Sequence, residues 1–244
     1  MKGCITMAPM ENYMPYSAGT DSVEAVNALF RKVYQYMAAG LILTALAAYL
    51  SASSQFMLQL LYTSQVPMIV IAVAELGLVL WISAGINKIS ASTARNLFFV
   101  YSVLNGILCS SVLLVYTGES VYKAFLSTAG MFGAMSLYGI YTKRDLTSMG
   151  GFLTMGLFGL IIAMVINMFV GSSRVELYIS IFGIIIFLGL TAYDTAKIKV
   201  LAANTDGEGG EFSGKIAVLG ALALYLDFVN IFLYLLRLFG ERRR

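Results

Sequence analysis

The sequence predicts an all-α membrane protein, built as a bundle of seven transmembrane helices. Hydrophobic residues make up 59% of the 244-residue chain and charged residues only 12%, about half the charged share of a soluble domain. The mean hydropathy is +0.82, and the apolar residues gather in runs of roughly twenty, the length that a helix needs to cross a bilayer. The lipid bilayer is therefore the first partner we expect.

Seven apolar runs are long enough to span the membrane. The residues before the first run lack the basic-then-apolar order of a signal peptide, so we expect that run to be a retained helix. We expect a polar cytoplasmic tail at residues 1–30, one transmembrane domain over residues 31–240 and a basic tail at residues 241–244. The connections at 117–120 and 171–174 are tight enough to make their flanking helices antiparallel. The predicted helices cover residues 33–53, 66–86, 95–116, 121–141, 150–170, 175–197 and 215–238.

Small residues recur at helix-packing spacing in two of these runs. Gly40, Thr44 and Ala48 follow one another at intervals of four, and Ala129 precedes Gly133 by the same interval. Small side chains let helix backbones approach closely inside a membrane. We therefore expect close helix contacts at both places.

The distribution of lysine and arginine predicts a cytoplasmic N-terminus, because basic residues are enriched in cytoplasmic loops. Only Lys123 and Arg174 would lie in outside loops, against ten basic residues inside. The tail GERRR disagrees with seven complete crossings, since it would lie outside together with Arg237. Either the tail does lie outside, which is the preferred interpretation, or the last segment is re-entrant and returns the tail to the cytoplasm. The ten inside residues are Lys2, Arg31, Lys32, Lys88, Arg95, Lys143, Arg144, Lys197, Lys199 and Lys215.

Composition excludes several kinds of chemistry. The chain has no histidine, which excludes histidine catalysis, histidine-ligated metal centres and a histidine pH switch. Cys4 and Cys109 are far apart, so they indicate neither a disulfide framework nor a thiolate metal site, and Cys109 is expected to be a packing residue. A net charge of +3 is too small to predict nucleic-acid binding. Any pH sensing must use carboxylates.

Three carboxylates fall inside the apolar runs: Glu75, Asp194 and Asp227. Ionisable residues within membrane segments are costly and often functional. Asp194 lies within about two turns of the cytoplasmic end of its run, and Asp227 lies about 18 Å into the last run from the same side. The two aspartates are therefore expected to face each other across the inner half of the membrane.

Each aspartate also has a purely structural interpretation. Asp194 could be a helix-end carboxylate that pairs with Lys197 or Lys199. Asp227 could make a structural hydrogen bond to a neighbouring helix, helped by Asn230 one turn further on.

Glu75 and the acidic loop at 204–212 are less specific. Glu75 has only Ile71 and Val79 at the i±4 positions of its own helix, so a packed, protonated side chain is as good an interpretation as a functional one. The loop, NTDGEGGEF, has the composition of a calcium loop without its ligand order, and we expect a solvated hinge.

Three motifs together resemble those of a known family. They are MFGAMSLYG followed by YTKRDL, then GLTAYDTAKIK, then LGALALYLDFVNIFLYLLRLFG. The chain resembles the transmembrane Bax inhibitor motif family, also called the Bax inhibitor-1 family, and within it the bacterial inner-membrane branch. The resemblance covers all seven runs. It implies a seven-helix fold with a central last helix and a pH-sensitive calcium leak.

The resemblance also implies roles for individual residues. Asp194 and Asp227 match the aspartates that form the proton-sensing pair of the family, and Glu75 occupies the place of a glutamate associated with the ion path. Some members have an arginine near the end of the second helix that locks the pair shut. This chain has Ile86 there, and Lys88 is the nearest base. Lysine is a point charge and not a planar fork, so a latch at Lys88 would differ from the arginine latch.

Physical chemistry points the same way for the aspartate pair. Two carboxylates in one site of low dielectric constant cannot both ionise cheaply, so Asp194 and Asp227 are expected to titrate as a unit. Calcium prefers hard oxygen ligands. We therefore expect protons and calcium to compete at this pair, with calcium as the bound or permeant ion and no other cofactor.

Three other classes of function share features with this sequence. Paired intramembrane aspartates also occur in intramembrane aspartyl proteases, but those carry GxGD and PAL motifs, whereas this chain has LYLD and no proline after Asp227; we therefore expect no enzyme. A rhodopsin-like receptor would need a lysine in mid-membrane, and Lys215 lies at the mouth of the last helix. The stronger alternative is an interaction protein, because some bacterial relatives are regarded as modulators of a membrane-bound ATP-dependent protease. Residues 1–30 would be the segment that engages such a complex.

The charge distribution makes a topological prediction: loops 87–94 and 198–214 lie inside and loop 54–65 lies outside. In a cysteine-free background, Gln59→Cys should react with a membrane-impermeant maleimide from outside the cell, and Ser90→Cys only after the membrane is opened. Labelling of position 59 only from the cytoplasmic side would contradict the predicted orientation.

Overall fold

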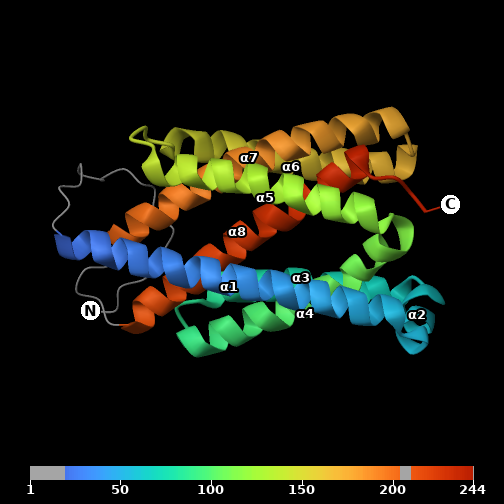
Figure 1. Cartoon of the computed structure of the whole chain (residues 1–244), viewed down its shortest axis with the longest axis horizontal. Helices are drawn as coiled ribbons and strands as arrows, with labels where there is room; N and C mark the ends of the chain where they lie inside the picture. The colour runs from blue at the N-terminus through green and yellow to red at the C-terminus, as the bar shows by residue number, and fades with distance from the viewer. Residues whose placement is uncertain (1–19, 204–209, 244) are drawn as a thin grey trace. The chain divides into compact units, whose positions relative to one another are not determined.

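The computed structural model is all-helical, as the sequence predicts (Figure 1). It describes residues 20–203 and 210–243. Within this part of the chain the only β-type pairing is an isolated bridge between Tyr116 and Arg242. The eight helices described there are α1 (Thr20–Ser53), α2 (Gln55–Tyr62), α3 (Val66–Gly85), α4 (Ala91–Val115), α5 (Gly118–Tyr141), α6 (Thr147–Val170), α7 (Ser173–Ala203) and α8 (Gly210–Phe239).

Six of the described helices are long and apolar enough to cross a membrane: α1, α3, α4, α6, α7 and α8. The remaining predicted span, 121–141, is the fourth along the chain; it is present as the helix α5, but α5 is not among the six. Its first turns carry Glu119 and Lys123, and serines, threonine and glycines recur along it, which lowers its hydropathy. The structure therefore supports an all-helical fold with six clear candidate spans.

The short helix α2 was not predicted. It lies in the expected loop 54–65, and Ser54 caps it by accepting a hydrogen bond from the backbone N–H of Met57 at 3.4 Å. Side-chain oxygens at this position satisfy one of the free N–H groups at a helix start. Eight residues carry too little periodic signal for a sequence-based prediction.

Two long helices extend beyond their predicted ends. α1 begins at Thr20, so part of the expected tail 1–30 is helical, and α7 continues to Ala203, six residues past the expected end at 197. The extension of α7, IKVLAA, is rich in good helix formers, so the helix continues where the apolar run stops. Residues 1–19 of the predicted tail and residues 204–209 of the predicted acidic hinge lie outside the described residues.

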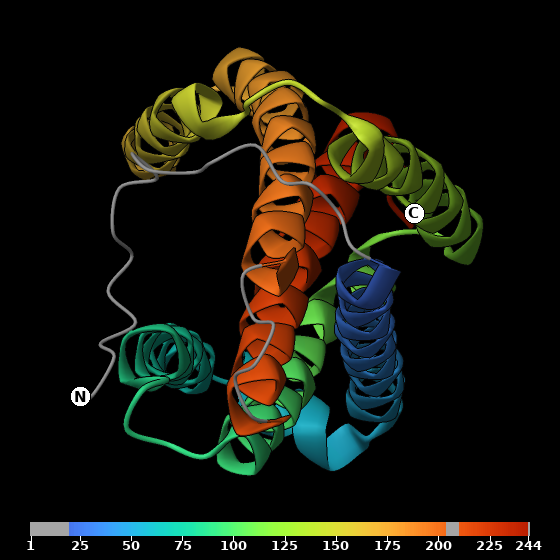
Figure 2. The same cartoon turned by 90° about the vertical axis from the view of Figure 1, so that its left-hand side faces the viewer.

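The chain divides into two compact units. Unit 1 comprises the described parts of 1–111 and 198–222, and unit 2 comprises those of 112–197 and 223–244. In Figure 2, α1 and α3 of unit 1 are both seen nearly end-on, so the axes of these two helices are nearly parallel lines. Asp194 and Asp227 both belong to unit 2, whereas Glu75 and Lys88 belong to unit 1.

Close packing of α1 against α4 forms the core of unit 1. A Cβ added at Gly40 would lie 2.7 Å from the Phe98 ring, and one added at Gly106 would lie 2.5 Å from the carbonyl oxygen of Thr44. The Thr44 hydroxyl reaches the carbonyls of both Gly40 and Ser102, each at 2.9 Å. The close approach predicted at Gly40 is confirmed.

The close helix contact predicted at Ala129 and Gly133 is wrong. A Cβ added at Gly133 would meet no atom within 4 Å. Small-residue spacing alone does not show which face of a helix meets a neighbour.

The last residues of the chain pair with the connection between α4 and α5. The N–H of Thr117 donates to the carbonyl of Glu241 at 3.0 Å, and the N–H of Arg243 donates to the carbonyl of Val115 at 2.8 Å. We call residues 240–243 the C-terminal clip. Both bonds lie within unit 2, so the clip fixes the end of α8 beside the start of α5.

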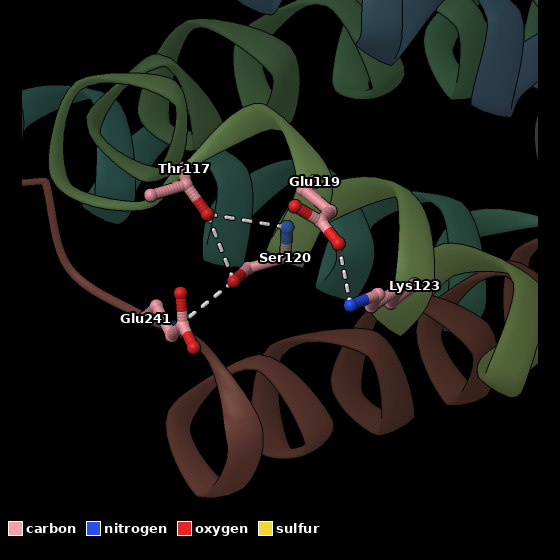
Figure 3. A network of polar contacts seen from close by, with 5 residues as sticks. All are labelled: Thr117, Glu119, Ser120, Lys123 and Glu241. Atoms are coloured by element: carbon pink, nitrogen blue, oxygen red, sulfur yellow. Dashed lines mark hydrogen bonds and ion pairs between the residues drawn. The ribbon is translucent and has the colours of Figure 1, made fainter.

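Side chains of α5 reinforce the C-terminal clip (Figure 3). The Ser120 hydroxyl accepts the N–H of Glu241 at 2.9 Å and lies 2.9 Å from the Thr117 hydroxyl. One turn away, the Lys123 ammonium pairs with the Glu119 carboxylate at 2.6 Å. The bond between Ser120 and Glu241 joins segments that are 121 residues apart in the sequence, and no sequence motif predicted it.

The α1–α4 contact makes a stability prediction. Gly106→Ala should destabilise the protein by about 1–3 kcal/mol, because the added Cβ would overlap the backbone of Thr44. Gly77→Ala is the matched control, since a Cβ there meets nothing within 4 Å and alanine is the better helix former. Thermal unfolding in detergent should show a lowered midpoint for Gly106→Ala and an unchanged or raised one for Gly77→Ala. Equal midpoints would contradict the close approach.

Candidate functional site

Helix α8 places Asp227 deep inside the protein. α8 is the most buried of the six candidate spans, with 67% of its apolar window buried. Asp227 itself is 3% exposed, and its neighbours Leu224 and Tyr225 are fully buried. A carboxyl group at such a place must be compensated by hydrogen bonds, a proton or a cation.

The hydrogen bonding around Asp227 is incomplete. The Thr191 side chain of α7 is a hydrogen-bonding neighbour of the Asp227 carboxyl group. The Thr191 hydroxyl also donates to the carbonyl of Phe187 at 2.8 Å. The second carboxyl oxygen, Oδ2, has no hydrogen-bond partner among the described residues. That oxygen is the atom at which a proton or a cation would bind.

Asp194 lies on α7, three residues after Thr191, and is half-buried. Its carboxyl group interacts electrostatically with that of Asp227. Lys197 also acts on Asp194, although its ammonium nitrogen lies 5.9 Å from the centre of the Tyr193 ring. Unit 2 thus brings the two predicted aspartates together. Lys197, which the structural interpretation paired with Asp194, also lies near Asp194.

The residues on both sides of Asp194 hold this part of α7 in place. Thr195 is fully buried, and its hydroxyl lies 3.1 Å from the Ser136 hydroxyl of α5. A Cβ added at Gly139 of α5 would lie 2.6 Å from the carbonyl of Ala192. On the α6 side, a Cβ at Gly150 would lie 2.5 Å from the Tyr193 ring. The close contacts with α5 and α6 thereby fix the rotation of α7 that presents Asp194.

The structural interpretation expected Asp227 to bond a neighbouring helix, and Thr191 of α7 provides that bond, whereas Asn230 bonds its own helix. Its side-chain amide donates to the carbonyl of Leu226 on its own helix at 2.8 Å. The Oδ2 atom of Asp227 is left without a partner.

The polar neighbours of Glu75 come from another helix, α4, and the sequence around Glu75 did not predict them. Its side chain is 9% exposed, and the Asn105 amide of α4 lies 3.5 Å from Oε2. The Cys109 thiol lies 3.6 Å from the carbonyl oxygen of the same amide, which orients the NH₂ group of Asn105 toward Glu75. The other carboxyl oxygen, Oε1, has no partner among the described residues.

Sequence reasoning missed the role of Asn105 and treated Cys109 as packing only. The available signal was an asparagine inside the apolar run 95–116, four residues before the cysteine, which places both on one face of a helix. This cluster belongs to unit 1, apart from the aspartates of unit 2.

The predicted latch residue Lys88 is exposed, in the turn after α3. Its backbone N–H donates to the carbonyl of Gly85 at 2.8 Å, while Ile86 is buried. The role of Lys88 stays a prediction.

The aspartate pair does not form a complete metal site. Over the described residues, no group of three or more Cys, Asp or Glu side chains is arranged to hold a metal ion. Calcium takes six to eight oxygen ligands at strong sites. Among the described acids, Asp194 and Asp227 supply two carboxyl groups to this place.

Comparison with known proteins agrees with the motifs. The family model described as inhibitor of apoptosis-promoting Bax1 matches residues 26–244. Inner membrane protein YbhL of Escherichia coli strain K12 is 46% identical over 212 residues, which cover 87% of this chain and 91% of YbhL.

Relatives in other bacteria are similar over most of their length. An uncharacterized protein of Borreliella burgdorferi is 43% identical over 221 residues, 89% of this chain and 93% of the relative. An uncharacterized membrane protein of Streptococcus pyogenes serotype M6 is 36% identical over 225 residues, 91% and 96% of the two chains. With its apolar helices, the chain therefore belongs to the Bax inhibitor-1 family and is a multi-pass protein of the bacterial inner membrane.

Proposed function

We propose that this protein is a proton-regulated cation leak channel, with calcium as the permeant ion and the Asp194–Asp227 pair as the site where protons and calcium compete. The observation that supports this proposal most is that the Asp227 carboxyl group is buried and incompletely hydrogen-bonded. It is 3% exposed on a membrane helix, and its Oδ2 atom has no hydrogen-bond partner among the described residues. A buried polar group with a structural role is normally hydrogen-bonded.

Competition follows from the charge of the pair. Two adjacent carboxylates repel each other, and either a proton on one of them or a cation beside both removes the repulsion. Calcium prefers such hard oxygen ligands. Lowering the pH protonates the pair and removes the charge that attracts calcium, so calcium binding weakens as the pH falls.

Glu75 is the second element of the proposed ion path. It is a buried carboxyl group with one oxygen held near Asn105 and one without a partner among the described residues. Lys88 is kept as the proposed latch, because it is the first base after α3.

We also propose that the chain crosses the membrane seven times, and the C-terminal clip supports this number. Backbone hydrogen bonds tie Glu241 and Arg243 to Thr117 and Val115, so the tail and the α4–α5 connection lie on one side of the membrane. The chain must therefore cross an even number of times between Thr117 and Glu241. Since α6, α7 and α8 are three candidate spans, α5 would be the fourth crossing between these points.

The same count bears on the alternative of a re-entrant last helix. With α5, α6 and α7 crossing and α8 returning, three crossings would put the tail on the opposite side from Thr117. The hydrogen bonds of the C-terminal clip disfavour that arrangement. With a cytoplasmic N-terminus, seven crossings place the tail outside.

Calcium binding and flux test the proposal directly. Purified protein in detergent should lose calcium affinity between about pH 8 and about pH 6, and Asp194→Asn or Asp227→Asn should weaken both binding and calcium flux into liposomes. The double variant should bind and pass little less calcium than the more impaired of the two single variants, because effects at coupled residues are not additive.

Glu176→Gln is the matched control, since Glu176 is an exposed acid at the other end of α7. Additive losses in the double variant would indicate two separate sites. A folded wild-type protein that passes no calcium would contradict the channel and favour the alternative, modulation of a membrane-bound ATP-dependent protease.

A further inference from the structure

A polar face of α4 meets Glu75 inside unit 1, and the proposed channel gives this face no role. Tyr101, Asn105 and Cys109 follow one another at intervals of four along α4, which places them on one side of the helix. The Asn105 amide lies 3.5 Å from Oε2 of Glu75. Tyr101 and Cys109 both interact electrostatically with the Glu75 carboxyl group. We call Glu75 and these three residues of α4 the Glu75 cluster.

The backbones that carry the Glu75 cluster are packed against the protein. Glu75 and Ile82 are the buried residues of α3, and their spacing of about two turns puts both on the face that α3 turns inward. A Cβ added at Gly106, beside Asn105, would lie 2.5 Å from the carbonyl oxygen of Thr44, so α4 is in close contact with α1 at this level. A change of state in the cluster is therefore easier in the side chains than in the helices.

The burial of the Glu75 carboxyl group is incompletely compensated. The side chain is 9% exposed, and its Oε1 atom has no hydrogen-bond partner among the described residues. In the same part of the chain, no basic side chain forms an ion pair with it. A carboxyl group at such a place must carry a proton or bind a cation. Since the Asn105 NH₂ group faces Oε2, which then acts as an acceptor, Oε1 is the atom that takes the proton or the cation.

The Asn105 amide has two orientations with opposite chemistry. Its NH₂ group only donates, whereas its carbonyl oxygen accepts hydrogen bonds or binds a cation. In the structure the Cys109 thiol donates to this oxygen, Oδ1, at 3.6 Å, which leaves the NH₂ group toward Glu75. An N–H donor beside the carboxyl group opposes a cation there. The carbonyl oxygen would instead be a further ligand of the kind that calcium prefers.

We propose that Asn105 is a cation ligand of the Glu75 cluster that works by turning its amide, and that Cys109 is the positioning residue that holds the amide in the cation-free orientation. When a cation reaches Oε1 of Glu75, the amide makes half a turn and Oδ1 joins Glu75 in binding the cation. The Cys109 S–H group then loses Oδ1 as its acceptor. This inference rests on the proposed place of Glu75 in the ion path and adds the regulation of that place.

Infrared spectroscopy of the S–H stretch tests the turn of the amide in the reconstituted full chain. Cys4 is the other cysteine of the sequence, so Cys4→Ser leaves Cys109 as the one thiol. Addition of calcium should shift the S–H band to higher frequency, because the thiol loses its hydrogen-bond acceptor. Glu75→Gln in the same background should abolish the shift. A band that calcium does not move, in protein that passes calcium, would overturn the inference.

Substitutions at the two α4 residues should act in opposite directions. Asn105→Leu removes the ligand and should raise the calcium concentration for half-maximal flux into liposomes about tenfold. Cys109→Ala releases the amide and should lower that concentration about twofold, since one weak hydrogen bond is lost. Cys109→Ser should behave like wild type, because a hydroxyl also donates to Oδ1.

Asn96→Leu is the matched control, since Asn96 is an exposed asparagine of the same helix, and it should leave the half-maximal concentration unchanged. Weaker calcium flux in both Asn105→Leu and Cys109→Ala would indicate a packing role for the two residues and overturn the inference. The S–H measurement needs no change at Asn105, so it decides the question should Asn105→Leu fail to fold.

Failure of the inference can be told apart from failure of the proposed channel. A shift of the S–H band in protein that passes no calcium would support the turn of the amide and contradict the channel. An unmoved band together with no flux would contradict both.

Discussion

The cost of burying the Asp227 carboxyl group governs this structure. Asp227 lies on the most buried candidate span, 3% exposed, with its Oδ2 atom unpartnered among the described residues. The polar groups close to it come from α7, as the Thr191 hydroxyl and the Asp194 carboxyl group. Such an arrangement is stable only while a proton or a cation offsets the charge. In the function we propose, this requirement is the reason that the pair responds to both.

The neighbouring helices serve to hold the pair in register. α5 and α6 contact α7 through Gly139 and Gly150, immediately beside Asp194, and at the far end the C-terminal clip fixes α8. About 20 Å of helix separates Asp227 from Gly240, where an added Cβ would lie 2.7 Å from the Tyr116 ring. α8 is thus held near the aspartate pair by packing and at its end by backbone hydrogen bonds.

Much of this could be predicted from the sequence, because hydropathy and intramembrane charge are local signals. The positions of Asp194, Asp227 and Glu75 within apolar runs identified them without a structure. The partners of these acids come from other helices: Asn105 reaches Glu75 from α4, and Thr191 reaches Asp227 from α7. Such contacts depend on helix rotation, which the nearly uniform apolar runs do not encode.

The C-terminal clip was beyond prediction for a similar reason. It joins Val115 to Arg243 through backbone atoms, so no pattern of side chains indicates it. The charge of the tail alone left two topologies open, and the polar composition of α5 keeps the predicted span 121–141 out of the six clear candidate spans. The backbone pairing of Thr117 with Glu241 bears on both questions, since it requires an even number of crossings between them.

The most direct measurement is infrared difference spectroscopy of the carboxyl C=O stretch in reconstituted protein as the pH is lowered, with and without calcium. Our account predicts a band from a protonated carboxyl group that calcium diminishes, that Asp227→Asn removes and that Asp194→Asn weakens or shifts; Glu75→Gln identifies any separate contribution from Glu75. A protonated-carboxyl band that ignores calcium, or that survives both aspartate substitutions, would contradict the assignment of this pair as the shared site of protons and calcium.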